Sequence, residues 1–312
     1  MAITLTQLRA FLAVVRTGSV TAAADELVVT QPSVSAAVSA LSRELGVALT
    51  ERVGRSVRPS PAGAAFSSYA ADVIGLLEQG ALAAAEAAGA RGAELRIAAV
   101  TTAGEHIVPP LLEAFAARRP ETTLSLEVGN RERVLDRLHT HSSDVAIGGR
   151  PPPDDSAVTG ERFLENPVVL LTAPGDPLAR RRRVPIDELG ERPWLLREEG
   201  SGTRTMTEEY LAGAGLHPPV LTLGSNGAIK QAVRAGLGVS LQSHLAVQLE
   251  LDLGLLETID LRDPHPARHW YVLRPARGPV RPIVEAFVDF VGSPTGRRAV
   301  ERAATQTAPP RS

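Results

Sequence analysis

The sequence of 312 residues contains no cysteine, which excludes disulfides, thiolate metal sites and a cysteine nucleophile. It also has no run of 18 apolar residues, so a membrane-spanning helix is not expected. The N-terminus lacks the profile of a signal peptide, because Arg9 and Arg16 interrupt its short apolar stretch. These absences predict a cytoplasmic protein, and its length allows roughly two to three domains.

Motifs typical of enzymes are also missing, since neither G-x-S-x-G nor H-E-x-x-H occurs. The best case for an enzyme is Ser201 in a glycine-rich turn with a histidine as base, but no general base is evident beside it. A solute-binding module is a second alternative. It leaves the N-terminal helices unexplained and would normally carry an export signal. The sequence therefore predicts a protein that is not an enzyme and has no metal or cofactor.

Two short helices near the N-terminus are predicted from capping residues and apolar spacing. Ser19 is a favourable N-cap, and the helix that follows it ends near Val28. Thr30 is expected to cap a second helix, with Pro32 just inside it and Gly46 at its end. This is the helix-turn-helix plan, whose second helix enters the major groove of DNA. The candidate DNA-binding residues of this helix are Thr30, Gln31, Pro32, Ser33, Ser35 and Ser39. Their composition alone fits a solvated helix equally well.

Three arginines after this helix favour the DNA-binding interpretation. Arg52, Arg55 and Arg58 recur around Gly54, as in a short hairpin that lays guanidinium groups along phosphate. A solvated basic loop is the alternative. The first sixty residues hold six arginines and four acids, a balance of +2, so DNA affinity is expected to need at least a dimer.

The segment LTQLRAFLAVVRTGSVTAAADELVVTQPSVSAAVSAL resembles the winged helix-turn-helix of LysR-type transcriptional regulators. The resemblance extends over nearly the whole chain. It implies a first helix over 5–17, a second over 21–27 and a recognition helix over 31–45. The chain departs from the family pattern at Leu49-Thr50, and Ala36, Ala37 and Ser39 leave the exposed recognition helix without a basic residue at these positions.

An alanine-rich stretch after the hairpin carries one apolar stripe, from Phe66 to Ala84, at helical spacing. A twin helix from a second copy is favoured over the chain's own body as its partner, and the family resemblance implies this too. A homodimer would set two recognition helices about one DNA turn apart, which predicts a partly palindromic site. Gly89 and Gly92 mark a hinge at the end of this helix.

From Glu94 onward, apolar runs alternate with helical patterns, which predicts an α/β class with parallel sheet. The runs LRIAAV, TLSLEV and DVAIGG form a first unit, and PVVLLTA, PWLLRE, PVLTLGS and GVSLQS form a second. The strand RHWYVLRP and a helix over 280–290 are expected to return to the first unit. Two such lobes form a cleft, and ligands bind at the C-terminal ends of the strands.

The cleft candidates follow from that rule, and the strongest are in the run REEGSGTR before a predicted helix. Its glycines can expose backbone N–H groups, and its hydroxyls and Arg204 add further donors, which suits an anion. An ordinary helix cap with a surface arginine is the alternative. The candidate effector-binding residues are Thr101, Thr102, Gly149, Arg150, Ser201, Gly202, Thr203, Arg204 and Asn226.

The family resemblance implies three parts: a winged helix-turn-helix over 1–60, a linker helix over 61–90 and a periplasmic-binding-protein-like α/β domain over 93–295. Lobe I of that domain is expected over about 93–163 and 267–293, and lobe II over 164–266. Residues 296–312 are predicted to form a disordered tail, because prolines and a glycine occur in this segment and in the turn just before it.

The phrases VGNRERVLDRL, DVAIGGRPP, REEGSGTR and SNGAIKQAVRAGLGVSL resemble the CbbR branch of the LysR family, which regulates carbon-fixation genes. That resemblance implies a small anionic metabolite as effector, double-stranded DNA as target, a homodimer or homotetramer, and RNA polymerase as a further partner. LysR branches that control sulfur, nitrogen or catabolic genes share parts of these motifs and remain alternatives.

Overall fold

The computed structural model describes residues 2–54, 56–89, 92–262 and 267–306. The chain forms two compact units, each described here by itself. The first unit comprises residues 1–91 together with 139–142 and 277–281, and the second comprises the remainder. None of the described helices has both the length and the apolar content needed to span a bilayer.

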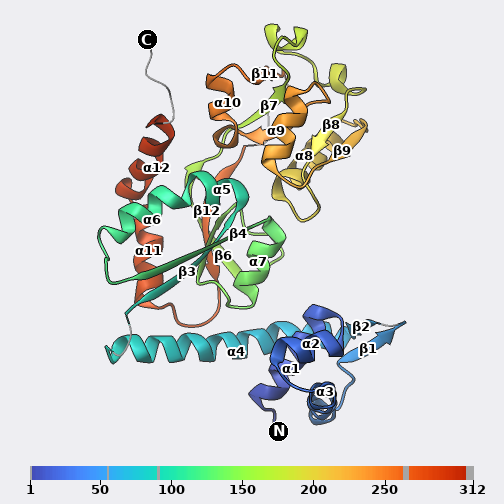
Figure 1. The fold of residues 1–312 in the computed structure, drawn as a ribbon, viewed down its shortest axis with the longest axis vertical. Helices are drawn as coiled ribbons and strands as arrows, with labels where there is room; N and C mark the ends of the chain where they lie inside the picture. Colours follow the sequence, from blue (N-terminus) through green and yellow to red (C-terminus); the bar gives the residue numbers. More distant parts are fainter. Residues whose placement is uncertain (1, 55, 90–91, 263–266, 307–312) are drawn as a thin grey trace. The chain divides into compact units, whose positions relative to one another are not determined.

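The first unit begins with the predicted helix-turn-helix (Figure 1). Ser19 caps its second helix by accepting a hydrogen bond from the Ala22 N–H, and Gly46 ends its third helix at φ 70°. Thr30 occupies the N-cap position, but its hydroxyl does not bond a backbone N–H; it pairs with Ser33 Oγ instead. The helices of this unit are α1 (Leu5–Thr17), α2 (Val20–Leu27), α3 (Gln31–Leu45) and α4 (Pro61–Ala87).

A hairpin of β1 (Thr50–Val53) and β2 (Ser56–Pro59) follows α3, as predicted for the wing. The 27-residue α4 begins after Ser60, which accepts a hydrogen bond from the Gly63 N–H. The apolar stripe predicted on α4 is divided between two environments. Ala70 is buried in the core that α4 shares with α1, whereas the side chains of Val73 and Leu77 are half exposed.

Lobe I of the second unit is a five-stranded sheet in the order β4-β3-β5-β12-β6. Helices α6 and α11 pack on one face of this sheet and α7 on the other (Figure 1). The return of β12 to this lobe confirms the predicted crossover. The elements of lobe I are β3 (Glu94–Val100), α5 (Thr101–His106), α6 (Val108–Ala116), β4 (Thr123–Gly129), α7 (Arg131–His139), β5 (Val145–Gly148), β6 (Val158–Glu165), β12 (His269–Pro275), α11 (Pro282–Gly292) and α12 (Pro294–Gln306).

Lobe II contains a three-stranded sheet in the order β10-β7-β11 and a parallel pair, β8 with β9. A single bridge between Trp194 and Val239 links β8 to the segment that leads into β10. The elements are β7 (Val168–Thr172), β8 (Trp194–Leu196), α8 (Gly202–Gly213), β9 (Val220–Thr222), α9 (Asn226–Arg234), β10 (Ser240–Ser243), α10 (Gln248–Asp252) and β11 (Glu257–Ile259).

Two sequence-based expectations need correction. The five-stranded sheet is mixed rather than parallel, because β3 is parallel to β4 and β5 but β12 is antiparallel to β5 and β6; the three-stranded sheet is antiparallel, with β7 antiparallel to both β10 and β11. The reason is that β6 leaves for lobe II and β12 returns from it. The expectation of disorder from residue 296 is wrong as far as Gln306, because α12 buries Ala299 and Val300. Residues 307–312 lie outside the described part of the chain.

Candidate functional site

The candidate DNA-binding residues of α3 are all exposed: Thr30, Gln31, Pro32, Ser33, Ser35 and Ser39. The opposite face of α3 is buried through Val34, Val38 and Leu41. A helix with this division can present its polar face to a groove while its apolar face stays in the core.

The polar groups at the start of α3 are already engaged in pairs. Gln31 Nε2 donates to Thr21 Oγ1 of α2 at 2.8 Å, and the hydroxyls of Thr30 and Ser33 lie 2.8 Å apart. The first of these bonds ties the recognition helix to the helix before it.

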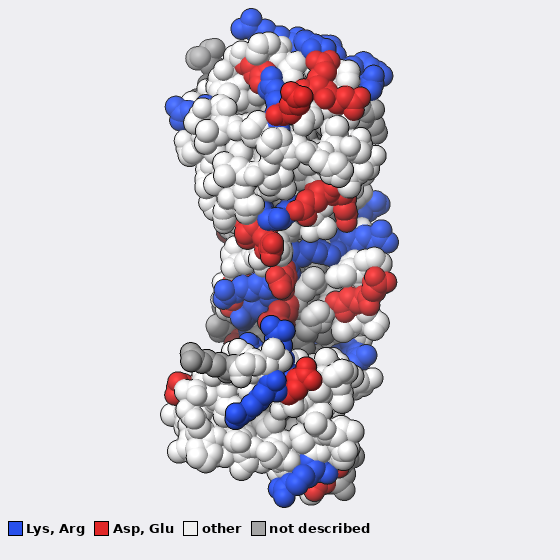
Figure 2. Space-filling model, turned by 90° about the vertical axis from the view of Figure 1, so that its right-hand side faces the viewer, with Lys and Arg blue, Asp and Glu red and all other residues white. Residues whose placement is uncertain are grey.

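The hairpin register assigns Arg52 and Arg58 to opposite faces of the wing. Arg52 pairs with Val57 and Arg58 with Glu51, and successive residues of a strand point to opposite faces. Both arginines are exposed. Arg55 lies outside the described residues. On the face drawn in Figure 2, acidic and basic side chains are interspersed, so no large area of one charge marks a nucleic-acid surface there.

The second unit contains a small cavity of about 40 Å³ between its lobes. The N-terminal end of α8 and the end of β3 meet at this cavity. Six of the nine candidate effector-binding residues line it: Thr101, Thr102, Gly149, Ser201, Gly202 and Thr203. Ser201 is buried at the N-cap of α8 and makes no side-chain capping bond, so the first N–H groups of α8 have no acceptor from this side chain.

Three arginines line this cavity: Arg197 is paired with Glu198 at 2.7 Å, and Arg131 and Arg268 come from lobe I. A Cβ atom at Gly149 would lie 3.5 Å from Arg131 Nη1 and 3.7 Å from Arg268 Nη2, which shows how closely both guanidinium groups approach. Burial, with the like charge of Arg131 adding to it, lowers the pKa of Arg268 to about 10. Burial also lowers the pKa of Arg131, against the opposing effect of Asp155. Two partly buried cations side by side favour an anion between them.

Two buried donors in the wall of the same cavity have no hydrogen-bond partner among the described residues. They are Asn166 Nδ2 and Trp270 Nε1. Asn166 is held in place by Ser243 Oγ, which donates to its Oδ1 at 2.6 Å, and by its own N–H, which donates to the Arg268 carbonyl at 2.9 Å. A buried donor without an acceptor is unfavourable, so these two N–H groups are uncompensated polar groups close to the cavity.

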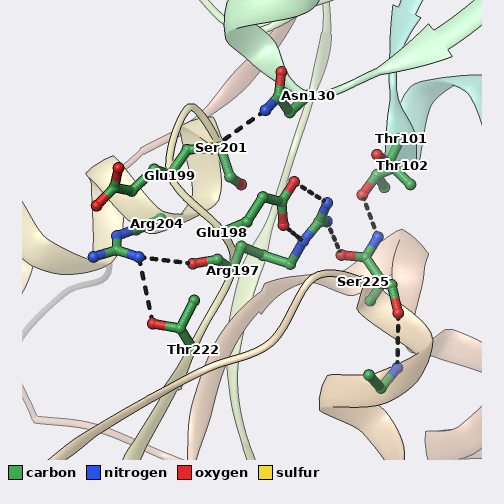
Figure 3. Close-up of polar contacts among 12 residues, drawn as sticks. Thr101, Thr102, Asn130, Arg197, Glu198, Glu199, Ser201, Arg204, Thr222 and Ser225 are labelled. Atoms are coloured by element: carbon green, nitrogen blue, oxygen red, sulfur yellow. Dashed lines mark hydrogen bonds and ion pairs between the residues drawn. The ribbon is translucent and has the colours of Figure 1, made fainter.

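The lobes contact each other on two sides of the cavity. Asn226 Nδ2 donates to Thr102 Oγ1 at 3.1 Å, and Asn130 Nδ2 donates to the Glu199 carbonyl at 3.2 Å (Figure 3). The Glu132 N–H donates to the Gly200 carbonyl at 3.1 Å. The bonds to the Glu199 and Gly200 carbonyls hold the loop before α8 against lobe I, and the Asn226 bond holds the start of α9 there.

Three candidate effector-binding residues have other positions. Asn226 lies behind the cavity wall, where it accepts a hydrogen bond from Arg197. Arg150 lines a second, wider cavity of about 490 Å³ that shares Arg131 and Arg268 with the first. Arg204 points away from the cavity, toward Glu208 and Thr222 (Figure 3). The structure thus differs from the expectation for Arg204: it does not line this cavity, whereas Arg131 and Arg268 do.

Besides Val100 at the end of β3, sequence reasoning missed seven residues that line the smaller cavity. Asn130 and Arg131 directly follow β4, so the rule of strand C-terminal ends could have found them. Arg268 precedes a strand, and no sequence signal pointed to it. The missed residues are Asn130, Arg131, Asn166, Arg197, Ser243, Arg268 and Trp270.

Comparison with known proteins gives two matches to family profiles. Residues 5–64 match "Bacterial regulatory helix-turn-helix protein, lysR family", and residues 88–293 match "LysR substrate binding domain".

Among similar proteins, the HTH-type transcriptional activator CmpR of Synechocystis sp. is 35% identical over 289 residues, covering 92% of this chain and 94% of that protein. The RuBisCO operon transcriptional regulator of Allochromatium vinosum is 36% identical over 300 residues, covering 95% and 98%. The Synechocystis PCC6803 CcmR regulatory domain, solved in complex with 2-PG, is 32% identical, with a TM-score of 0.61 over 64% of this chain and 96% of that one.

Proposed function

Because this chain belongs to the LysR family of DNA-binding transcriptional regulators and is not an enzyme, we propose that a small anionic metabolite, bound between its lobes, controls how it acts on promoters. The observation that carries this proposal is the pair Arg131 and Arg268 at the interlobe cavity. A cavity lined by these two cations and by the hydroxyl-bearing residues Thr101, Thr102 and Ser201 is suited to a ligand made of acceptors.

The chemical class that fits best is a compact oxyanion such as a phosphate or carboxylate. The volume of about 40 Å³ admits one such group, and the N–H groups at the start of α8 add the positive end of a helix dipole. The similar CcmR regulatory domain was solved in complex with 2-PG, which supports the proposal. We therefore take 2-PG as the first ligand to test on this chain.

For DNA binding, we propose that α3 enters the major groove with its exposed residues Gln31, Ser33, Ser35 and Ser39 toward base edges. The wing arginines, including Arg52 and Arg58, then contact phosphate. The exposed half of the α4 stripe is covered by the same helix of a second copy, giving a homodimer on a partly palindromic site. Dimers pair into tetramers, and RNA polymerase is a further partner.

Ligand binding acts on DNA binding only through a difference in affinity between two arrangements of the protein. A coupling of about 1 to 3 kcal/mol is typical of such systems. We propose that closure of the lobes on the anion changes the bend that a DNA-bound tetramer imposes. The target genes are carbon-fixation genes, as for the similar RuBisCO operon regulator, rather than sulfur, nitrogen or catabolic genes.

The test of the effector site is calorimetric titration of the full chain with 2-PG and, separately, with inorganic phosphate. Saturable 1:1 binding per chain that Arg268→Gln weakens, while the control Arg204→Gln retains it, supports the site. Equal loss in both variants, or no binding of either probe, contradicts it.

The test of the regulatory function is capture of fragmented genomic DNA from the source organism, followed by sequencing of the bound fraction. Enrichment of a few intergenic sites beside carbon-fixation genes supports the proposal. Enrichment beside other genes replaces the regulon and keeps the mechanism, whereas no enrichment at low salt favours the solute-binding alternative.

A further inference from the structure

Three polar side chains form a hydrogen-bonded chain that crosses from lobe II to lobe I beside the smaller cavity. Arg197, directly after β8, donates from Nη1 to Asn226 Oδ1 at 2.5 Å, and Asn226 Nδ2 donates to Thr102 Oγ1 at 3.1 Å (Figure 3). Arg197 and Asn226 are each 5% exposed, and Thr102 lines the cavity. The chain of hydrogen bonds therefore ends where the anion is proposed to bind.

The direction of these hydrogen bonds is set by the arginine. A guanidinium group can only donate, so the atom of Asn226 that faces Arg197 has to be the carbonyl oxygen. The other end of the amide, which faces Thr102, is then the NH2 group, and this group can only donate as well. The hydroxyl of Thr102 therefore accepts from Asn226, although a hydroxyl by itself could do either.

A hydroxyl that accepts from Asn226 still has its own hydrogen to donate. Among the described residues, the Thr102 hydroxyl makes no hydrogen bond other than the one from Asn226, so this hydrogen has no acceptor there. The neighbouring Thr101 differs, because its hydroxyl donates to the Gly129 carbonyl at 3.4 Å. The O–H of Thr102 is thus available to an acceptor in the cavity, and a charged acceptor forms the stronger bond.

Arg197 acts in this chain as a fixed donor rather than as a cation for the ligand. Its Nε and Nη2 donate to the two carboxylate oxygens of Glu198 at 2.7 and 2.9 Å, and its Nη1 donates to Asn226. The paired carboxylate compensates the charge and holds the plane of the guanidinium. Asn226 is held by its place at the start of α9, which Ser225 caps by accepting from the Ala228 N–H at 3.1 Å. A reversed amide would bring N–H donors of both side chains together.

We infer that Asn226, held by Arg197, is a positioning residue that commits the Thr102 hydroxyl to donate its hydrogen to the bound anion. The inference rests on the proposed anion site between the lobes. Because Asn226 belongs to lobe II and Thr102 to lobe I, the donor is oriented only while the two lobes are in contact. The ligand atom that meets Thr102 is an acceptor without hydrogen, such as a carboxylate or phosphate oxygen.

The experiment is a double-mutant cycle in which calorimetry measures the Kd of the full-length chain for 2-PG. Thr102→Val keeps the branched shape and loses the hydroxyl, and Thr102→Ser keeps the hydroxyl. Asn226→Asp keeps the oxygen that Arg197 needs and replaces the NH2 group with a second oxygen, so that Thr102 has to donate to it instead. The double variant completes the cycle. Thr222→Val on β9 is the control for loss of a threonine hydroxyl outside the cavity.

Thr102→Val should raise the Kd about ten- to hundredfold, the effect of losing one hydrogen bond to a charged group. Thr102→Ser and Thr222→Val should stay within about threefold of the wild type. Asn226→Asp should raise the Kd further, because its charge repels the anion and the hydroxyl also turns away from it. In the Thr102→Val background only the repulsion remains, so the factor for Asn226→Asp should be at least about tenfold smaller there. A merely structural role of Asn226 would give the same factor in both backgrounds.

A second variant makes the same comparison without a new charge, and it serves if Asn226→Asp does not fold. Asn226→Ala leaves the Thr102 hydroxyl free to rotate, so binding has to restrict it. The Kd should rise about three- to tenfold, and this factor should vanish in the Thr102→Val background.

Two kinds of result overturn the inference, and they differ in what else they affect. If Arg268→Gln weakens binding, then wild-type affinity in Thr102→Val, or equal factors for the Asn226 variants in both backgrounds, refutes the positioning role and leaves the anion site intact. No binding of 2-PG by the wild type refutes the positioning role together with the proposed site.

Discussion

Replacement of Arg268 by glutamine should stabilise the ligand-free protein while it weakens anion binding. The side chain is partly buried beside Arg131, and the pKa of Arg268 is lowered to about 10, first by burial and then by its like-charged neighbour. At neutral pH the guanidinium is charged in both the folded and the unfolded state. The folded state therefore bears the full unfavourable free energy of holding that charge.

The magnitude follows from the shift. A lowering of about 2.5 pKa units at ~1.36 kcal/mol per unit corresponds to about 3 kcal/mol, as an upper bound. Arg268→Gln recovers part of this and loses the packing of the arginine stem, so we expect a gain of about 1 to 3 kcal/mol in the free energy of unfolding. The penalty is present below pH 10 and is relieved as pH rises above 10, because the folded state then loses this proton more readily than the unfolded state.

The loss in binding has the opposite sign and a similar size. A hydrogen bond to a charged group contributes about 1.5 to 3 kcal/mol, so the Kd for 2-PG should rise about ten- to hundredfold. The stability gain and the binding loss come from the same charge, which makes the two results a linked prediction.

The assay is thermal unfolding with and without 2-PG in phosphate-free buffer, together with calorimetric titration. Arg204→Gln is the matched control, because Arg204 pairs with Glu208 outside the cavity. Its effect on either quantity should stay below about 1 kcal/mol. Arg268→Gln that is less stable than the wild type without ligand, or that binds 2-PG with wild-type affinity, would refute the reasoning.

Three further predictions concern strain, closure and pH. Val28 is 90% exposed and has a φ of 55°, a conformation that costs a non-glycine residue roughly 1–2 kcal/mol. Val28→Asn should therefore raise the free energy of unfolding, measured by urea titration, by about 1 kcal/mol. An unchanged free energy of unfolding would argue against strain at this position. Gly200→Ala adds a Cβ at a position with φ +77°, and this Cβ would lie 2.4 Å from Glu132 Oε2. The substitution should weaken 2-PG binding about five- to thirtyfold. If calorimetry finds equal affinity, the protein does not bind 2-PG with the loop before α8 held against lobe I. Although burial acts to raise it, the pKa of Asp176 is lowered to about 2 by hydrogen bonds from Arg192, Thr172 and the Leu178 N–H. Its stabilising contribution should therefore be present above about pH 4 and lost as pH falls toward 2, and an Asp176→Asn variant with the same acid-unfolding curve as the wild type would exclude this.

Local features of the sequence were sufficient for the helix-turn-helix. A capping serine at Ser19, a proline at Pro32 and a glycine at Gly46 each act within one helical turn, so their effect does not depend on the rest of the chain. The same holds for the glycine-rich turn before α8, which places Ser201 and Gly202 at a helix N-terminus. Hydroxyls that follow a strand, such as Thr101 and Thr102, could be assigned to the cleft for the same reason.

The expectations that failed depended on distant contacts. The direction of β12 is set by the crossover that brings it back from lobe II, and the helix from Pro294 is stabilised by burying Ala299 and Val300 in lobe I. Neither packing surface is visible in the local pattern. The proline and the glycine at the start of the helix from Pro294 led to the prediction of a disordered tail.

The sequence by itself determined the family, the DNA-reading helix and the loop that begins α8, because caps, turns and apolar periodicity are local properties. Only the tertiary structure decided the charge of the cleft. Arg131 and Arg268 are far apart in the chain, and one starts a helix while the other precedes a strand. They become a pair because the two strands that connect the lobes bring Arg268 back to the end of β4, and an anion site depends on that convergence rather than on either residue alone.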